Sequence, residues 1–220
     1  MNADQVAALR ALLAPTGWLD RTADFAHALR RSARTPRGLL IVGTRTDEPW
    51  HMTAHLQQES ELADLPELAP TLVRWAPEPG GPEHLSVGLD RLTDAGREET
   101  LLVVSQQVAP DELLERVNDV RRAGATIFAL DQDDPELDSL AHESLPVVPA
   151  SSPVSFDGAQ HLVSAAVGDP DQTGGRRRAT SRTGWSDSRG HRAPAIGQRD
   201  ESLRGRLARL LDAVSGTSTE

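Results

Sequence analysis

The chain has 220 residues, a formal net charge of −10 and no cysteine. This length allows one sizeable domain with extensions. The lack of Cys excludes disulfides, thiolate metal sites and a cysteine nucleophile. Lysine is also absent, which excludes lysine Schiff bases and the phosphate-binding lysine of P-loop proteins.

Charge and hydropathy predict a cytoplasmic protein with neither membrane nor nucleic acid as partner. No apolar run approaches the roughly 20 residues that span a bilayer, and the first ten residues lack a signal-peptide pattern. Residues 1–168 hold 13 arginines against 26 acidic residues, whereas residues 169–220 hold 10 against 7. The acidic body argues against nucleic-acid binding by the folded part.

In the N-terminal half the chain alternates between helical and strand patterns. Helices are expected at 2–14, broken by Pro15 to Gly17, and then at 18–33, 49–62 and 84–95. Strands are expected at 39–42, where every residue is apolar, and at 71–75, which is shorter and more polar. An irregular segment rich in Pro and Gly covers 76–82.

The stretch 101–130 predicts a complete strand–helix–strand unit. Residues 101–104 are apolar at every position, as in a strand covered on both faces. An apolar stripe then runs along 111–123, Gly124 ends the helix, and 125–130 is a second uncharged run. Two buried strands joined by a helix form a parallel unit with a right-handed crossover.

The remaining pattern gives a helix at 135–143, a strand at 145–148 and a closing helix at 156–167. About five strands alternating with helices predict a three-layer α/β/α sandwich around a five-stranded parallel sheet, of the flavodoxin-like type. We expect N-terminal helices (1–35) packed on this domain (36–168). A disordered basic linker (169–200) and a short amphipathic helix (201–215) then follow.

Three segments resemble the sugar isomerase (SIS) domain, in the order found in that family. They are residues 39–43 with the threonine-bearing loop after them, residues 101–112, and residues 121–127 together with Leu140-Ala141. The resemblance covers about residues 20–167. It implies an SIS-type fold, a homodimer, and a phosphosugar held at the carboxyl ends of the first and third strands. We place the dimer contact on the helical region of Trp18 and Phe25.

The resemblance assigns the ligand to two loops. The predicted ligand-binding residues are Gly43, Thr44, Arg45, Thr46, Asp47, Ser105, Gln106 and Gln107. Several positions depart from the family pattern of small and hydroxylated residues. Arg45 stands at the second glycine and Asp47 at the serine of the first loop. In the second loop, residues 107–110 read Gln-Val-Ala-Pro where the family has Ser-Gly-Glu-Thr.

These departures weaken anion binding. Hydroxyl donors are lost, Val108 adds bulk where glycine lets backbone approach an anion, and Asp47 is expected to cap the following helix. The sequence therefore favours a non-catalytic SIS-like binding, scaffolding or regulatory protein with a degenerate phosphosugar site. The alternative is a phosphosugar isomerase or sugar-phosphate sensor with an altered pocket, and no catalytic residue is assigned.

Other polar clusters are better explained without a ligand, so no metal and no cofactor is assigned. His51 and His55 are four residues apart on one predicted helix, which could hold a metal with Glu48 or Glu59, but a solvent-facing pair is the simpler reading. Asp131, Asp133 and Asp134 suit Mg²⁺, and equally a turn that caps a helix. His142 is a possible general base or a structural histidine.

The C-terminal region carries two features that suggest a protein partner. Trp185 is an isolated indole in a polar segment, and Leu203–Leu211 forms an apolar stripe too short to be stable alone. The three arginines at 176–178 resemble a kinase site or a weak polyanion contact.

Overall fold

The structure, a computed structural model, describes residues 13–77 and 80–168. It contains a sheet of five parallel strands in the order β2-β1-β3-β4-β5, which confirms the predicted fold class. The strands are β1 (Leu39–Val42), β2 (Pro70–Val73), β3 (Thr100–Ser105), β4 (Thr126–Asp131) and β5 (Glu143–Pro146).

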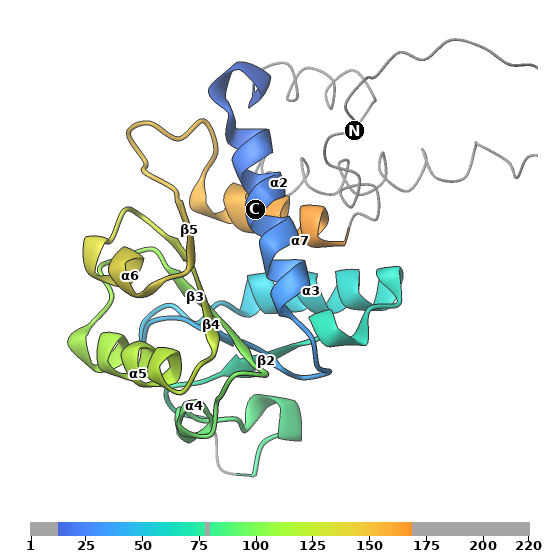
Figure 1. The fold of residues 1–220 in the computed structure, drawn as a ribbon, viewed down its shortest axis with the longest axis vertical. Coiled ribbons are helices and arrows are strands. Elements are labelled where there is room, and N and C mark those ends of the chain that lie inside the picture. Colours follow the sequence, from blue (N-terminus) through green and yellow to red (C-terminus); the bar gives the residue numbers. More distant parts are fainter. Residues whose placement is uncertain (1–12, 78–79, 169–220) are drawn as a thin grey trace, which may run out of the picture.

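Helices cover both faces of the sheet (Figure 1). One face carries α2 (Trp18–Ser32), α3 (Trp50–Ala63) and α7 (Phe156–Val167). The other carries α4 (Asp90–Thr93), α5 (Asp111–Arg122) and α6 (Pro135–Leu140). Successive side chains of a strand point to opposite faces, so Leu39 and Ile41 enter the first layer and Leu40 and Val42 the second.

The central strand–helix–strand unit forms as the sequence predicts. All six residues of β3 are buried, and α5 turns its apolar stripe onto the sheet. Gly124 ends the unit with φ +102°, a conformation that other residues rarely adopt. Residues 100–105 pair in parallel with 126–131 over their whole length.

The helix predicted for 84–95 is wrong. The structure has a 3₁₀ turn at Glu83–Leu85 and only the short α4 at Asp90–Thr93. Between them the Val87 carbonyl accepts a hydrogen bond of 2.9 Å from the Arg74 amide, and Gly88 forms a bridge with Arg74. Pairing with the edge of the sheet therefore replaces helical hydrogen bonds in this segment.

The bounds of three further elements differ from the predicted ones. The helix predicted to reach 143 ends at Leu140, and β5 begins two residues earlier than predicted. The His142 amide donates to the Ile127 carbonyl at 2.8 Å, which aligns the chain with β4 before the apolar residues of β5 begin. The strand predicted for 71–75 likewise lies at Pro70–Val73.

The N-terminal helical region packs on the sheet through the residues expected to form a dimer contact. Trp18 and Phe25 are 2% and 4% exposed, and Phe25 meets Phe128 edge to face with ring centroids 5.4 Å apart. These two side chains belong to the chain's own core, and a dimer contact through the helical region that carries them stays a prediction. The predicted homodimer itself stays a prediction.

Short 3₁₀ turns also lie at Ala14–Thr16 and Pro66–Leu68. The predicted helix within residues 2–12 and all features of 169–220 lie outside the described residues. Among the described residues, no helix combines the length and apolarity needed to cross a membrane.

Candidate functional site

The strand order reverses between β1 and β3, because the chain leaves β1 for the edge strand β2 and then returns to β3. Ligands of open α/β sheets bind outside the carboxyl ends of the strands at such a reversal. The loop between β1 and α3 carries Gly43, Thr44, Arg45, Thr46 and Asp47, and Ser105, Gln106 and Gln107 follow in order at the end of β3. All predicted ligand-binding residues therefore border this crevice.

In the first loop, the space beside Gly43 is filled by the loop itself. A Cβ atom at residue 43 would lie 2.2 Å from the Asp47 carbonyl oxygen and 2.6 Å from Cδ of Pro49. Thr44 and Asp47 form an antiparallel bridge, in which the Asp47 amide donates to the Thr44 carbonyl at 3.2 Å. The glycine thus lets the backbone of the loop fold back on itself. The carbonyl of Asp47 and the ring of Pro49 fill the space beside Gly43 that an anion would need.

Asp47 does not cap the following helix, so that prediction is wrong. Helix α3 begins at Trp50, its N-cap position is occupied by Pro49, and no side chain forms a cap hydrogen bond there. The bridge between Asp47 and Thr44 holds Asp47 in the turn before the helix.

Glu48, rather than Asp47, anchors the first loop. Its carboxylate accepts hydrogen bonds from Nε of Arg74 at 2.9 Å and from the Trp75 amide at 3.0 Å. The indole Nε1 of Trp75 donates to the Gly43 carbonyl at 2.8 Å. The side chains of Arg74 and Glu48 are only 18% and 12% exposed, so this ion pair is little screened by water. The loop is therefore tied to the end of β2.

In the second loop, the potential donors are used within the protein. Ser105 is fully buried, and its hydroxyl donates to the Gln107 carbonyl. The Ala109 amide donates to Oδ2 of Asp134 at 2.7 Å. Val108 is 77% exposed. A hydroxyl and an amide that could hold an anion are thus both engaged with protein oxygens.

The acidic cluster after β4 forms a turn and a helix cap. Oδ1 of Asp131 accepts from the amides of Asp133 and Asp134 at 2.7 and 2.9 Å. Oδ1 of Asp134 accepts from the Glu136 and Leu137 amides at 3.0 and 3.2 Å, which caps α6. These hydrogen bonds confirm the predicted turn and helix cap. Burial raises the pKa of Asp131, and its two amide hydrogen bonds oppose that shift.

Arg45 is the exposed cation at the crevice. Its side chain is 72% exposed, lies 3.5 Å from the carboxylate of Glu112, and stacks over the Trp75 ring at 5.2 Å. Exposed ion pairs of this kind contribute little free energy. Arg45 is therefore free to change partner at small cost, unlike Arg74.

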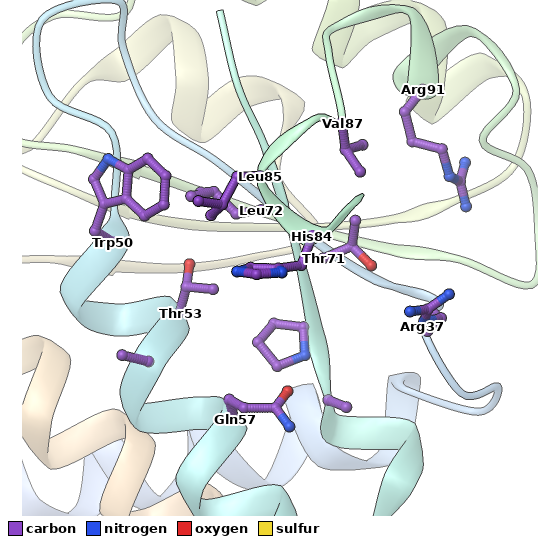
Figure 2. A pocket seen from close by; sticks show the side chains of 13 residues that line it. Arg37, Trp50, Thr53, Gln57, Thr71, Leu72, His84, Leu85, Val87 and Arg91 are labelled. Atoms are coloured by element: carbon purple, nitrogen blue, oxygen red, sulfur yellow. The ribbon is translucent and has the colours of Figure 1, made fainter. Parts of the chain in front are cut away.

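Two hollows lie away from the loop contacts just described. Gln106 lines a cleft of about 480 Å³ beside the N-terminus of α7, where Ser155 and Asp157 also lie. A larger pocket of about 770 Å³ runs along the edge strand β2 (Figure 2). Trp50 lies at one side of this larger pocket and Arg37 and Arg91 at the other. None of the predicted ligand-binding residues lines the larger pocket.

His142 is a structural residue at the amino ends of the strands, away from the crevice. Its Nδ1 accepts a hydrogen bond of 2.9 Å from the Ile127 amide, near the start of β4. The crevice lies at the other ends of the strands, so His142 cannot act as a general base there.

A cluster of three histidines joins α3 to α7. His51 and His55 from α3 meet His161 from α7, and the three ring centroids are 4.4 to 4.7 Å apart. One ring nitrogen from each histidine lies within 4.8 Å of those from the other two. The pair was apparent from its spacing in sequence, whereas His161 was missed. A histidine in the apolar closing helix was the available signal.

No family model and no curated protein matches the chain. A solved structure described as a "putative phosphosugar isomerase" from Silicibacter pomeroyi DSS-3 shares 18% identity at a TM-score of 0.47, over 75% of this chain and 48% of that one. A "putative sugar binding protein" from Salmonella typhimurium LT2 shares 12% at 0.44, over 90% and 56%. The chain thus spans about half the length of these two proteins.

Replacing Gly43 by alanine should destabilise the protein, because the new Cβ would overlap the backbone of Asp47. We expect a loss of about 1–3 kcal/mol of unfolding free energy, the usual range for overpacking. Gly88→Ala is the matched control, since its nearest neighbour would lie 3.4 Å away. Urea unfolding curves measure both changes. Equal effects of the two substitutions would contradict the packing described for the first loop.

Replacing Asp134 by alanine should remove the cap of α6 and leave the Ala109 amide without its partner. We expect a loss of about 2–4 kcal/mol, the sum of a lost cap and an unpaired buried donor. Asp138→Ala, an exposed acid on the same helix, should change stability by less than about 0.5 kcal/mol. Chemical denaturation of the two variants tests the difference, and a stable Asp134→Ala protein would disprove the role given to this carboxylate.

Proposed function

We propose that this chain is a non-catalytic binding protein of SIS-like fold, acting as a scaffold or regulator, whose phosphosugar site is degenerate. One observation carries the proposal. The Ala109 amide of the second loop is held by the Asp134 carboxylate at 2.7 Å, in the region where an anion would need free donors. The filled space beside Gly43 supports the same conclusion for the first loop.

The free-energy cost of reopening this crevice is substantial. A ligand phosphate competing for the Ala109 amide would have to displace a carboxylate, and hydrogen bonds to charged groups contribute about 1.5–3 kcal/mol each. The displaced Asp134 would then lose a partner while its own charge faced the phosphate. At 5 Å and an effective dielectric near 20, that repulsion is on the order of 3 kcal/mol per unit charge. Together these two free-energy costs exceed the stabilisation that one exposed arginine could give the bound phosphate.

Catalysis of an isomerisation also needs a base that can reach the substrate. Asp131, whose pKa is raised by burial, is 1% exposed and holds two backbone amides through one oxygen. His142 lies at the amino ends of the strands, whereas the crevice lies at their carboxyl ends. Neither residue meets the geometric requirement for general base catalysis at the crevice.

A sugar-phosphate sensor or isomerase with an altered pocket is the second candidate, and Arg45 is the observation in its favour. This side chain is exposed and only weakly paired with Glu112. The hydroxyls of Thr44 and Thr46 lie 3.4 Å apart in the same loop. These three residues could supply donors to an anion from the outer side of the loop.

If the chain acts as a scaffold, it would contact its protein partner through surfaces other than the crevice. Trp185 and Leu203–Leu211, which the sequence suggests for this role, lie outside the described residues. Homodimer formation also belongs to the proposal.

A thermal-shift panel of pentose, hexose and heptose phosphates tests the proposal on the full chain. A ligand present at 1,000 times its dissociation constant would add about 4 kcal/mol of stability, and at this chain length each kcal/mol raises the melting temperature by roughly 2–4 °C. We expect no ligand at millimolar concentration to raise the melting temperature by more than about 1 °C.

A shift of several degrees would overturn the proposal if it depends on the crevice. Arg45→Ala and Thr46→Ala, both at exposed positions, should then abolish it, whereas Ser139→Ala on exposed α6 should not. A shift that all three variants retain would place the ligand elsewhere and leave the degenerate crevice intact.

A further inference from the structure

The three-histidine cluster is built by two helices that pack side by side on one face of the sheet. His51 and His55 lie four residues apart on α3, so both project from the same side of that helix. His161 projects from α7 to meet them, with ring centroids 4.5 Å from His51 and 4.4 Å from His55. The contact therefore depends on the tertiary packing of α3 against α7.

His161 is the buried member of the cluster. It is 4% exposed, and within the described part of the chain its ring contacts His51 and His55 and forms no hydrogen bond. Buried polar groups nearly always have a partner in the protein, in ordered water or in a bound ion. An ion held jointly with His51 and His55 would give this ring such a partner.

The geometry of the cluster suits a cation. His51, His55 and His161 each offer one ring nitrogen, and these three atoms all lie within 4.8 Å of one another. The neutral imidazole nitrogen is a common metal ligand.

We propose that His51, His55 and His161 form a site for a divalent transition-metal ion, with Zn²⁺ as the expected occupant. Imidazole nitrogens favour zinc and neighbouring transition metals over Mg²⁺ and Ca²⁺. Zn–N distances of about 2.0–2.1 Å in a tetrahedron require nitrogens roughly 3.3 Å apart. The present separations, all within 4.8 Å, come into that range by small side-chain rotations.

His51 determines the access to this site. It is exposed, His55 is half-buried and His161 is buried, so the cluster opens to solvent on the side of the first turn of α3. Three protein ligands leave the fourth tetrahedral position to water or to a small ligand. The site requires none of the crevice hydrogen bonds, so it stands whether or not the crevice binds a phosphosugar.

Zinc binding to the chelator-treated, full-length protein tests the proposal. Isothermal titration with ZnCl₂ should give one site per chain, and substitution by Co²⁺ should give the intense visible absorption of a tetrahedral nitrogen site. His51→Ala, His55→Gln and His161→Gln should each weaken zinc binding at least tenfold. His84→Gln, at an exposed histidine outside the cluster, is the matched control and should bind zinc as the parent does.

His51→Ala keeps the test decisive if the buried variant His161→Gln fails to fold, because His51 is exposed. The melting temperature of the parent should also rise with zinc, whereas that of the His51→Ala protein should not. The proposal is overturned by a parent chain that binds no zinc, by zinc binding that the cluster variants retain, or by an equal loss in His84→Gln.

Discussion

The hydrogen bonds of the Asp134 carboxylate hold together the loops at the carboxyl ends of β3 and β4. One oxygen caps α6 through two amides, and the other holds the Ala109 amide of the loop after β3. Asp131 completes the arrangement by accepting the Asp134 amide. A 4% exposed carboxylate is tolerable only because it is fully engaged in this way. The same engagement ties the loop after β3 to the start of α6.

The opposite layer of the sandwich is organised by the packing of α7 between α2 and α3. Most of the residues in α7 are buried, including the polar Gln160, His161 and Ser164. Polar groups at such positions carry a cost unless they find partners. Ser164 meets this requirement by donating to the carbonyl of His161 one turn earlier. The imidazole of His161 contacts the rings of His51 and His55, so the polar residues of the closing helix contribute to its packing against α3.

The fold was predictable from sequence because its signals are local and redundant. The apolar runs at 39–42 and 101–104, the stripe of α5 and the stop at Gly124 each agree with the others, and all were found as predicted. The helix prediction for 84–95 was wrong because the apolar spacing of this segment suits a helix. Val87 and Gly88 instead pair with Arg74, a long-range contact that local spacing does not reveal. Local propensity is overridden where the edge of a sheet offers hydrogen bonds. The prediction that Asp47 caps α3 was wrong for a similar reason. Asp47 pairs with Thr44 in a turn within the loop, before the helix begins.

The sequence by itself determined most of the strands and helices along the chain and the two loops at the carboxyl ends of β1 and β3. Only the tertiary structure decided which atoms those loops bind. Asp134 lies 25 residues from the amide that it binds, and His161 lies 106 residues from His55. Periodicity reports which face of an element is buried, and it carries no information about which side chains from separate elements come to lie within a few ångströms.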